Sequence, residues 1–214
     1  MAEDVKRAYR SDLRRDQARD TRRRIVAAAS ELFVAGGYAG TTVDAIAEAA
    51  GVSRKTVFGA VGGKAELLAT ALNWAVAGDD EPVPLADRAE VRELLARENP
   101  HALIDGWVEV LVGVDARVGE LFAALEHAAT TDEVARALLT TLNAQRREGA
   151  RAVVDALAAL GALDDGLTRA EAVDVACLFA DPVFHRRLVG ARRWSIKRFT
   201  AWLAGTLHGQ LLNG

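Results

Sequence analysis

A run of hydroxyl-bearing and basic residues, Ser53-Arg54-Lys55-Thr56, follows Gly51-Val52 in the N-terminal part of the chain. Such side chains donate hydrogen bonds to phosphate oxygens and to base edges in a DNA groove. Gly51 permits a sharp turn and Ser53 is a good N-cap, so the run is expected at the exposed start of a short helix. Lys64 lies at the expected start of the next helix and could hold one phosphate. The pattern therefore predicts contact with nucleic acid.

The cysteine and histidine residues do not have the spacing that catalysis or metal binding needs. Cys177 and His185, eight residues apart, would be about 12 Å apart along a helix, too far for proton transfer between them. His101, His127 and His208 form no paired ligand spacing, and no phosphate-binding glycine loop occurs. We therefore expect no enzyme, no metal site and no cofactor, and a Cys177 thiol that is simply packed.

The composition favours a helical protein without covalent cross-links. Only four prolines occur in 214 residues, and Ala and Leu are frequent between them. The one cysteine excludes an internal disulfide framework, and charged residues stand where a secretory signal would be apolar. No apolar run reaches the roughly 18 residues of a membrane span. We therefore expect a cytoplasmic protein without membrane contact.

Apolar residues recur at spacings of three and four, and no alternating strand pattern occurs, so helices are expected throughout. Thr41 or Thr42 can cap the second helix, and Pro182 should kink the penultimate one. The acidic, proline-containing segment 79–84 is the clearest linker. Helices are predicted over 21–35, 43–50, 54–61, 67–77, 85–97, from 100 onward, and over 132–160, 168–189 and 195–211.

Charge is distributed unevenly around an overall value of −3. Residues 1–64 contain twelve Lys and Arg against eight Asp and Glu, whereas the rest of the chain has an acidic excess. A basic head can neutralise phosphates and an acidic body is repelled by DNA, so this asymmetry would orient the approach to DNA. Ordinary fluctuation in composition would explain the same asymmetry.

The run from Thr41 to Phe58 and the run from Lys64 to Leu68 resemble the TetR family of repressors. The preceding apolar stripe from Ile25 to Phe33 and the turn Gly36-Gly37-Tyr38 fit the same family. The resemblance covers roughly residues 22–72. A weaker resemblance to the last two helices of these regulators extends over residues 182–207.

The resemblance implies an all-α fold, with an N-terminal three-helix helix-turn-helix DNA-binding domain and a C-terminal helical bundle for ligand binding and dimerisation. We expect a basic flexible arm over 1–20, the DNA-binding domain over 21–66 and the body over 67–214. The implied function is that of a homodimeric repressor, which a small-molecule effector releases from a palindromic operator in double-stranded DNA.

The turn and the resemblance together predict a set of DNA-binding residues around the third helix. The chain departs from the family at Phe58-Gly59-Ala60-Val61, where the family often has tyrosine, histidine and a further aromatic residue. Base readout is therefore expected to be thinner and salt dependence strong. Arg54 and Lys55 could instead be merely solvated, and Phe58 could belong to the core. The predicted DNA-binding residues are Thr42, Ser53, Arg54, Lys55, Thr56, Phe58, Gly59 and Lys64.

The body offers two further sets of candidates. Its last two helices carry more apolar surface than one bundle edge needs, which suggests a dimer interface, although the same residues could fill the monomer core. The expected interface residues are Val173, Phe184, Leu188, Phe199, Trp202, Leu203 and Leu207. Candidate effector contacts are Trp74, Trp107, Phe122, His127, Phe179 and His185, each of which could equally be a core residue.

Two other classes of protein stay open beside a DNA-binding regulator. One is an enzyme, against which the cysteine and histidine spacing argues. The other is a helical adaptor whose basic head binds an acidic protein or an anionic membrane. The segment 42–64 favours DNA, because its turn and caps suit a groove-reading helix and give no long lipid-facing stripe.

Overall fold

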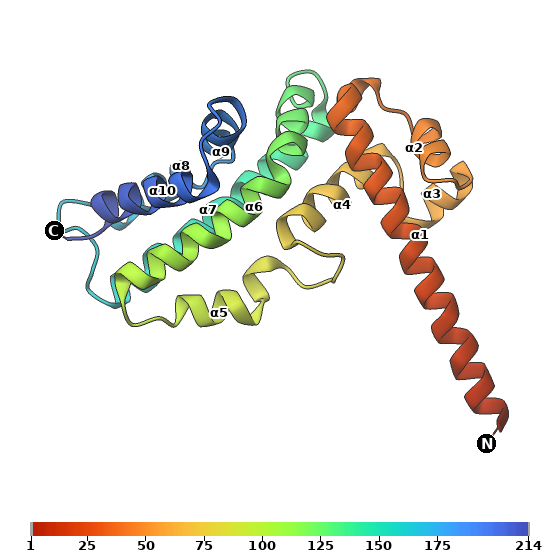
Figure 1. Cartoon of the computed structure of the whole chain (residues 1–214), viewed down its shortest axis with the longest axis horizontal. Helices are drawn as coiled ribbons and strands as arrows, with labels where there is room; N and C mark the ends of the chain where they lie inside the picture. The colour runs from red at the N-terminus through yellow and green to blue at the C-terminus, as the bar shows by residue number, and fades with distance from the viewer. Residues whose placement is uncertain (1, 214) are drawn as a thin grey trace.

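The computed structural model describes residues 2–213, with side chains from Leu13 onward. Apart from an isolated bridge between Leu163 and Leu212, the described residues form helices, turns and loops. The first three helices form a head at one end of an elongated molecule, and the remaining helices form a body (Figure 1). The all-α fold expected from the sequence is confirmed.

The head consists of α1 (Ala2–Gly40), α2 (Val43–Ala49) and α3 (Arg54–Ala60). α1 contains one non-helical residue, Gly37, whose φ of 68° interrupts the helix where the sequence predicted its end. The buried Thr41 donates to the carbonyl oxygens of Leu32, at 3.0 Å, and Gly37, at 2.8 Å. Thr41 thus satisfies carbonyls at this break and does not cap α2.

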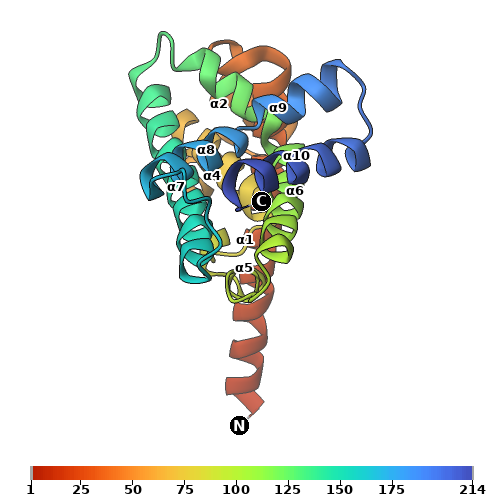
Figure 2. The same ribbon diagram turned by 90° about the vertical axis from the view of Figure 1, so that its left-hand side faces the viewer.

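The helix expected from Thr21 begins much earlier, at Ala2. The first half of α1 extends beyond the other helices (Figures 1 and 2). The segment has a helical backbone because no proline or glycine occurs before Gly36. The expected helix start at Thr21 is therefore wrong, while independent motion of the 1–20 arm stays a prediction.

The body begins with α4, which starts at the predicted phosphate-binding Lys64 and ends at Gly78, a left-handed C-cap with φ of 90°. The short helix η1 occupies the first part of the predicted 85–97 helix. Pro182 breaks the predicted 168–189 helix rather than kinking it, and a π-helical turn, η2, follows. The elements are α4 (Lys64–Ala77), η1 (Leu85–Asp87), α5 (Ala89–Leu95), α6 (Pro100–Ala128), α7 (Glu133–Ala159), α8 (Arg169–Phe179), α9 (Val183–His185), η2 (Arg186–Ala191) and α10 (Ile196–Leu211).

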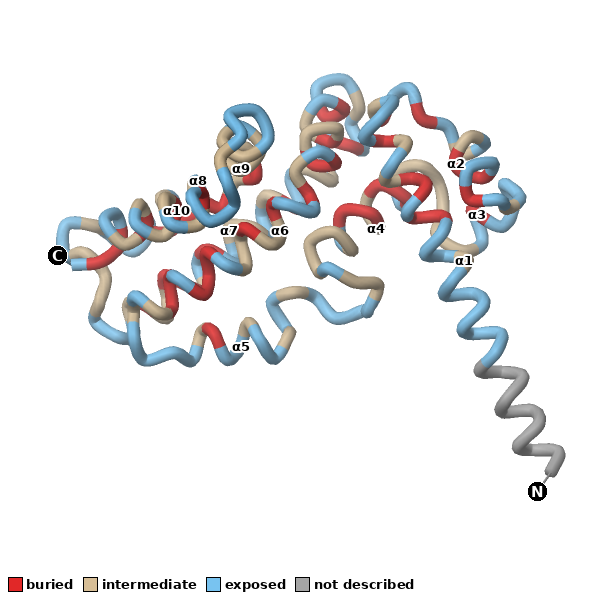
Figure 3. Tube along the Cα trace, viewed as in Figure 1, coloured by how far each residue is buried: buried red, intermediate tan, exposed pale blue. Residues whose placement is uncertain are grey.

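Buried apolar side chains form two clusters. Buried positions occur both in the head and along the body (Figure 3). The head-side cluster joins α1 to α4 with the near parts of α6 and α7, and contains Phe33, Ile46 and Leu125. The distal cluster joins the far parts of α6 and α7 with α8 and α10, and contains Val154 and Phe199. The head therefore shares its core with the body, so the expected domain boundary near residue 66 does not separate two cores.

Candidate nucleic-acid interface

The N-terminal end of α3 is exposed and firmly capped. The backbone N–H of Thr56 donates to Ser53 Oγ at 3.1 Å, and the two hydroxyl oxygens of these residues are 2.8 Å apart. Gly51, with φ of 65°, makes the turn from α2, and Val52 N–H donates to Ala47 O at 3.0 Å. On the other side of the turn, α2 is capped by the Thr42 hydroxyl. The turn at Gly51 joins α2 and α3 in a helix-turn-helix arrangement, and each helix has its own N-cap.

The predicted residues on these two helices are exposed together, but Arg54 is not free. Its guanidinium donates to Asp44 Oδ2 on α2 at 2.8 Å and lies 5.6 Å from the ring centroid of Phe58. Phe58 is 47% exposed, so it is a surface residue and not part of the core. Lys55 and Gly59 are exposed as well. The sequence did not identify Asp44 as a partner, although its place in the first turn of α2 brings it beside Arg54.

Lys64 is half-buried and held by the head. Its ammonium nitrogen lies 4.3 Å from the ring centroid of Tyr38 and 3.4 Å from Ala39 O. Burial raises the pKa of the Tyr38 phenol above its ordinary value. A phosphate approaching the start of α4 would meet a lysine that is already oriented at that end of the helix.

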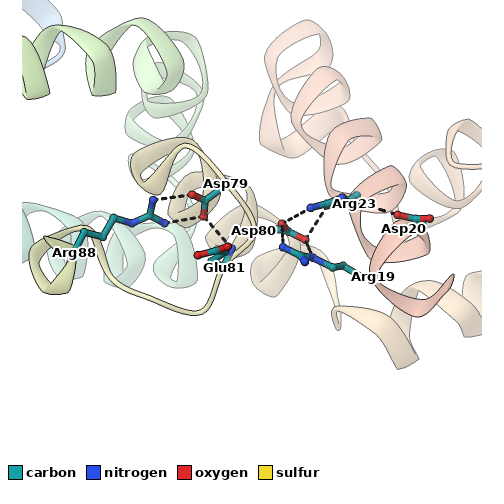
Figure 4. A network of polar contacts seen from close by, with 7 residues as sticks. All are labelled: Arg19, Asp20, Arg23, Asp79, Asp80, Glu81 and Arg88. Carbon is teal, nitrogen blue, oxygen red and sulfur yellow. Dashed lines mark hydrogen bonds and ion pairs between the residues drawn. The ribbon is translucent and has the colours of Figure 1, made fainter. Parts of the chain in front are cut away.

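An ion-pair cluster that the sequence analysis missed joins α1 to the linker after α4 (Figure 4). Asp80 accepts hydrogen bonds from Arg19, with both distances 2.6 Å, and from Arg23, at 2.7 and 2.9 Å. The Asp80 side chain is 5% exposed, and the Arg19 and Arg23 donors hold the pKa of its carboxyl well below the ordinary value. We call this group the Asp80 clamp.

Asp79 extends the same connection toward α5. It accepts hydrogen bonds from Arg88 at 2.6 and 2.7 Å, which together with the backbone N–H of Glu81 lower the pKa of Asp79 to about 2. The linker is thus joined to α1 by the ion pairs of Asp80 and to the start of α5 by those of Asp79. The complementary charges of the Arg-rich helix and the acidic linker were visible in the sequence, but their pairing was not predicted.

The six candidate effector contacts do not surround one site. Trp107 and Phe122 are buried in different apolar clusters, and His127 is exposed on α6, so it lines no interior site. Trp74 lies beneath Arg22 and lines surface clefts between α1, α4 and the linker. Only Phe179 and His185 belong to one neighbourhood, the aromatic group around Phe199 and Trp202.

Most of the candidate dimer residues face inward. Val173, Phe199, Leu203 and Leu207 are buried in the distal cluster of the chain. Their side of each helix packs α8 and α10 against α6 and α7. The other three candidates, Phe184, Leu188 and Trp202, are half-buried against the same cluster.

The described residues contain no group of three or more His, Cys, Asp or Glu side chains placed to hold a metal ion. The described helices also include none that is both long and apolar enough to cross a membrane.

The head of the chain matches known proteins in sequence. Residues 25–71 match the family profile described as bacterial regulatory proteins, tetR family. Over 56 residues, the chain is 46% identical to two proteins of Pseudomonas putida, the uncharacterized HTH-type transcriptional regulator TtgW and the HTH-type transcriptional regulator SrpR. These segments are 26% of this chain, 42% of TtgW and 26% of SrpR.

Solved structures resemble the whole chain. A transcriptional regulator from Saccharomonospora viridis, in complex with choline, has a TM-score of 0.69 at 19% identity, over 91% of this chain and 99% of its own. NalD, the secondary repressor of the MexAB-OprM multidrug efflux pump in Pseudomonas aeruginosa, has a TM-score of 0.68 at 21% identity, over 92% and 98%. At these identities the likeness shows the fold.

A capped, exposed recognition helix on a helical body defines a helix-turn-helix regulator of transcription. The head matches the family profile and the regulators from Pseudomonas, and the body has the fold of regulators with the same head. Over residues 25–71, the chain has the DNA-binding head of the TetR family of bacterial regulatory proteins.

Proposed function

We propose that this chain is a homodimeric repressor that binds a palindromic operator through two heads and leaves it when a small molecule binds in the body. The observation that carries the proposal is the exposed start of α3, where Lys55 and Thr56 follow a side-chain cap and Arg54 lies beside them. This is the end of a recognition helix that reaches base edges in a major groove. A dimer follows from groove geometry, because half-sites about one helical turn apart, roughly 34 Å, need two linked heads.

Two solved relatives support the finer parts of this proposal. NalD is a repressor, and the Saccharomonospora viridis regulator binds choline. In this chain, α4 packs against α1 and α6, so a ligand that prefers one arrangement of the body would change the separation of the two heads. The affinity for the operator would then fall by a factor set by how much more tightly the ligand binds that arrangement than the DNA-binding one.

Selection of genomic DNA fragments by the purified protein, followed by titration, tests the DNA-binding part. We expect a short palindrome. Thr56→Ala should relax the preference at one base position by about 1–3 kcal/mol, because one base contact is lost. Lys64→Ala should weaken all sequences alike and reduce the salt slope by about 1, because one phosphate contact is lost.

Two exposed positions away from the head serve as controls. Thr140→Ala on α7 removes a hydroxyl and Arg92→Ala on α5 removes a positive charge. Neither should change the sequence preference, the operator affinity or the salt slope. If no sequence were enriched at any salt concentration, or if the controls matched the head variants, the operator proposal would be wrong and a non-DNA partner for the basic head would gain support.

A further inference from the structure

A polar layer separates the two apolar clusters inside the body. On α6, Val118 belongs to the head-side cluster and Val112 to the distal cluster, with Asp115 between them. On α7, Leu142 belongs to the head-side cluster and Ala150 to the distal cluster, and Arg146 lies between these two. The break in the apolar core therefore falls at matching points of two packed helices.

The terminal nitrogens of Arg146 already have partners in this layer, while its Nε is buried without a hydrogen-bond partner. Its guanidinium is 3.0 Å from Asp181 Oδ2, donates to Asn143 Oδ1 at 3.1 Å and lies 5.6 Å from the ring centroid of Phe122. Asp181 is also engaged through its other oxygen, which accepts from the backbone N–H of Val183 at 2.9 Å. The Arg146–Asp181 pair therefore balances its own charge.

Asp115 is left without such a balance. The residue is 2% exposed, and its Oδ2 is buried without a hydrogen-bond partner. Burial raises the pKa of the Asp115 carboxyl to about 8; the nearby Asp181 adds to the rise, and Arg146 opposes it. A buried carboxyl without a donor is costly, and such groups concentrate at functional sites.

We propose that Asp115 anchors an effector site in this polar layer, and that the site takes an organic cation with N–H donors, such as a primary alkylammonium. The inference rests on the proposed function, since it names the ligand class of the proposed effector. The charges favour a cation: Arg146 and Asp181 balance each other, so a cation bound at Asp115 would take the place of the proton that this carboxyl holds when the layer is empty. The free oxygen selects an N–H donor, which a quaternary ammonium lacks.

The position of the layer explains how such a ligand would act on the head. The head-side cluster contains residues of α1 and α4 together with those of α6 and α7, so it extends without a break from the polar layer to the head. A cation at Asp115 would change the packing of α6 against α7 where the two clusters meet. The arrangement of the head would then depend on whether the layer is occupied.

Isothermal titration calorimetry with butylammonium, on the full chain without DNA, tests the site itself. We expect saturable binding of one cation per chain, much weaker binding of butyltrimethylammonium, and none of butanol or butyrate. Asp115→Asn, which keeps the side-chain shape, should weaken butylammonium binding roughly thirtyfold or more. Glu120→Gln removes an exposed acid from the same helix and should leave binding unchanged.

Absence of butylammonium binding to the wild type would overturn the proposal, as would equal affinity of wild type and Asp115→Asn, or equal binding of the alcohol. The wild-type comparison of the four probes does not depend on whether a variant folds. The operator titration is repeated with butylammonium at saturation, and we expect lower DNA affinity for the wild type only. Operator binding that ignores a bound cation would reject the regulatory role while leaving the proposed DNA binding intact.

Discussion

At the scale of single residues, the interface is built from groups that already have partners. Arg54 is paired with Asp44, and Lys64 lies on Tyr38. Such contacts orient long side chains before DNA arrives and so reduce the entropy lost on binding. They also mean that DNA must compete for these cations, and an acidic residue beside a phosphate opposes binding.

Asp44→Asn should strengthen operator binding, because it releases the Arg54 guanidinium and removes a negative charge from the face that meets phosphate. We expect an increase of roughly three- to tenfold at low salt, and a smaller increase at high salt. Fluorescence anisotropy over a series of salt concentrations measures it. Glu48→Gln, which neutralises another exposed acid on α2, is the control, and an equal gain there would show a general charge effect rather than release of Arg54.

Asp115 makes the free energy of unfolding depend on pH. Its folded pKa of about 8 lies above the unfolded value. As pH rises from about 4, the unfolded state loses this proton first, so the contribution of Asp115 falls until about pH 8 and is constant above it. Asp115→Asn should remove this loss and raise the free energy of unfolding at pH 8 by a few kcal/mol.

Urea unfolding at several pH values from 5 to about 8.5 tests this difference, with Glu120→Gln as the control. If Asp115→Asn lost stability at pH 8, or if its pH profile matched that of the wild type, the claim that Asp115 is a buried carboxyl without a partner would be wrong. The result is independent of any ligand, because the measurement uses the protein alone.

At the scale of elements, the sequence predicted what depends on neighbouring residues and missed what depends on distant ones. The Ser53 cap and the helix starts predicted at 168 and 195 are confirmed: Thr168 with Glu171 forms a capping box, Ser195 is an N-cap, and each cap bonds within its own first turn. The Asp80 clamp joins residues 57 and 61 positions apart, which no local pattern reveals. For Phe199 and Leu203 the sequence left two readings open, a dimer interface or the monomer core, since an apolar stripe does not say whether its neighbour is the same chain or another.

The Asp80 clamp should hold the linker against α1. Asp80→Asn removes the charge that both arginines share, so we expect faster amide hydrogen exchange over 79–84 and in α1 around Arg23, with the core helices unchanged. Asp87→Asn, an exposed acid nearby, should change neither segment. Unchanged exchange in Asp80→Asn would show that packing, and not the ion pairs, holds the linker.

The clamp also has a defined response to acid. Because the folded pKa of Asp80 is lowered, its stabilisation is complete above the unfolded value near pH 4 and is lost as pH falls through the folded value. Exchange in the linker of the wild type should therefore stay slow through the neutral range.

At the scale of the whole molecule, the proposed dimer needs a surface that the monomer core does not use. The outward side of α8 offers one: Leu178 is 58% exposed, opposite the buried Val173 and Ala176 side of the helix, and α8 packs beside α10. A second copy that covers this face would bury Leu178 and complete the pairing of two heads. The sequence analysis placed the interface on the last helices of the body, and four of the residues that it named there are buried within the chain.

Leu178→Asp should therefore convert a dimer into monomers, because a buried charge without a partner costs several kcal/mol at an interface. Sedimentation velocity measures the change, and thermal unfolding checks that the monomer still folds. Leu160→Asp, at a position 39% exposed at the end of α7, is the matched control and should stay dimeric. The monomer should also lose most of its operator affinity, since one head reaches only one half-site. A folded Leu178→Asp variant that remained dimeric would place the interface on another face.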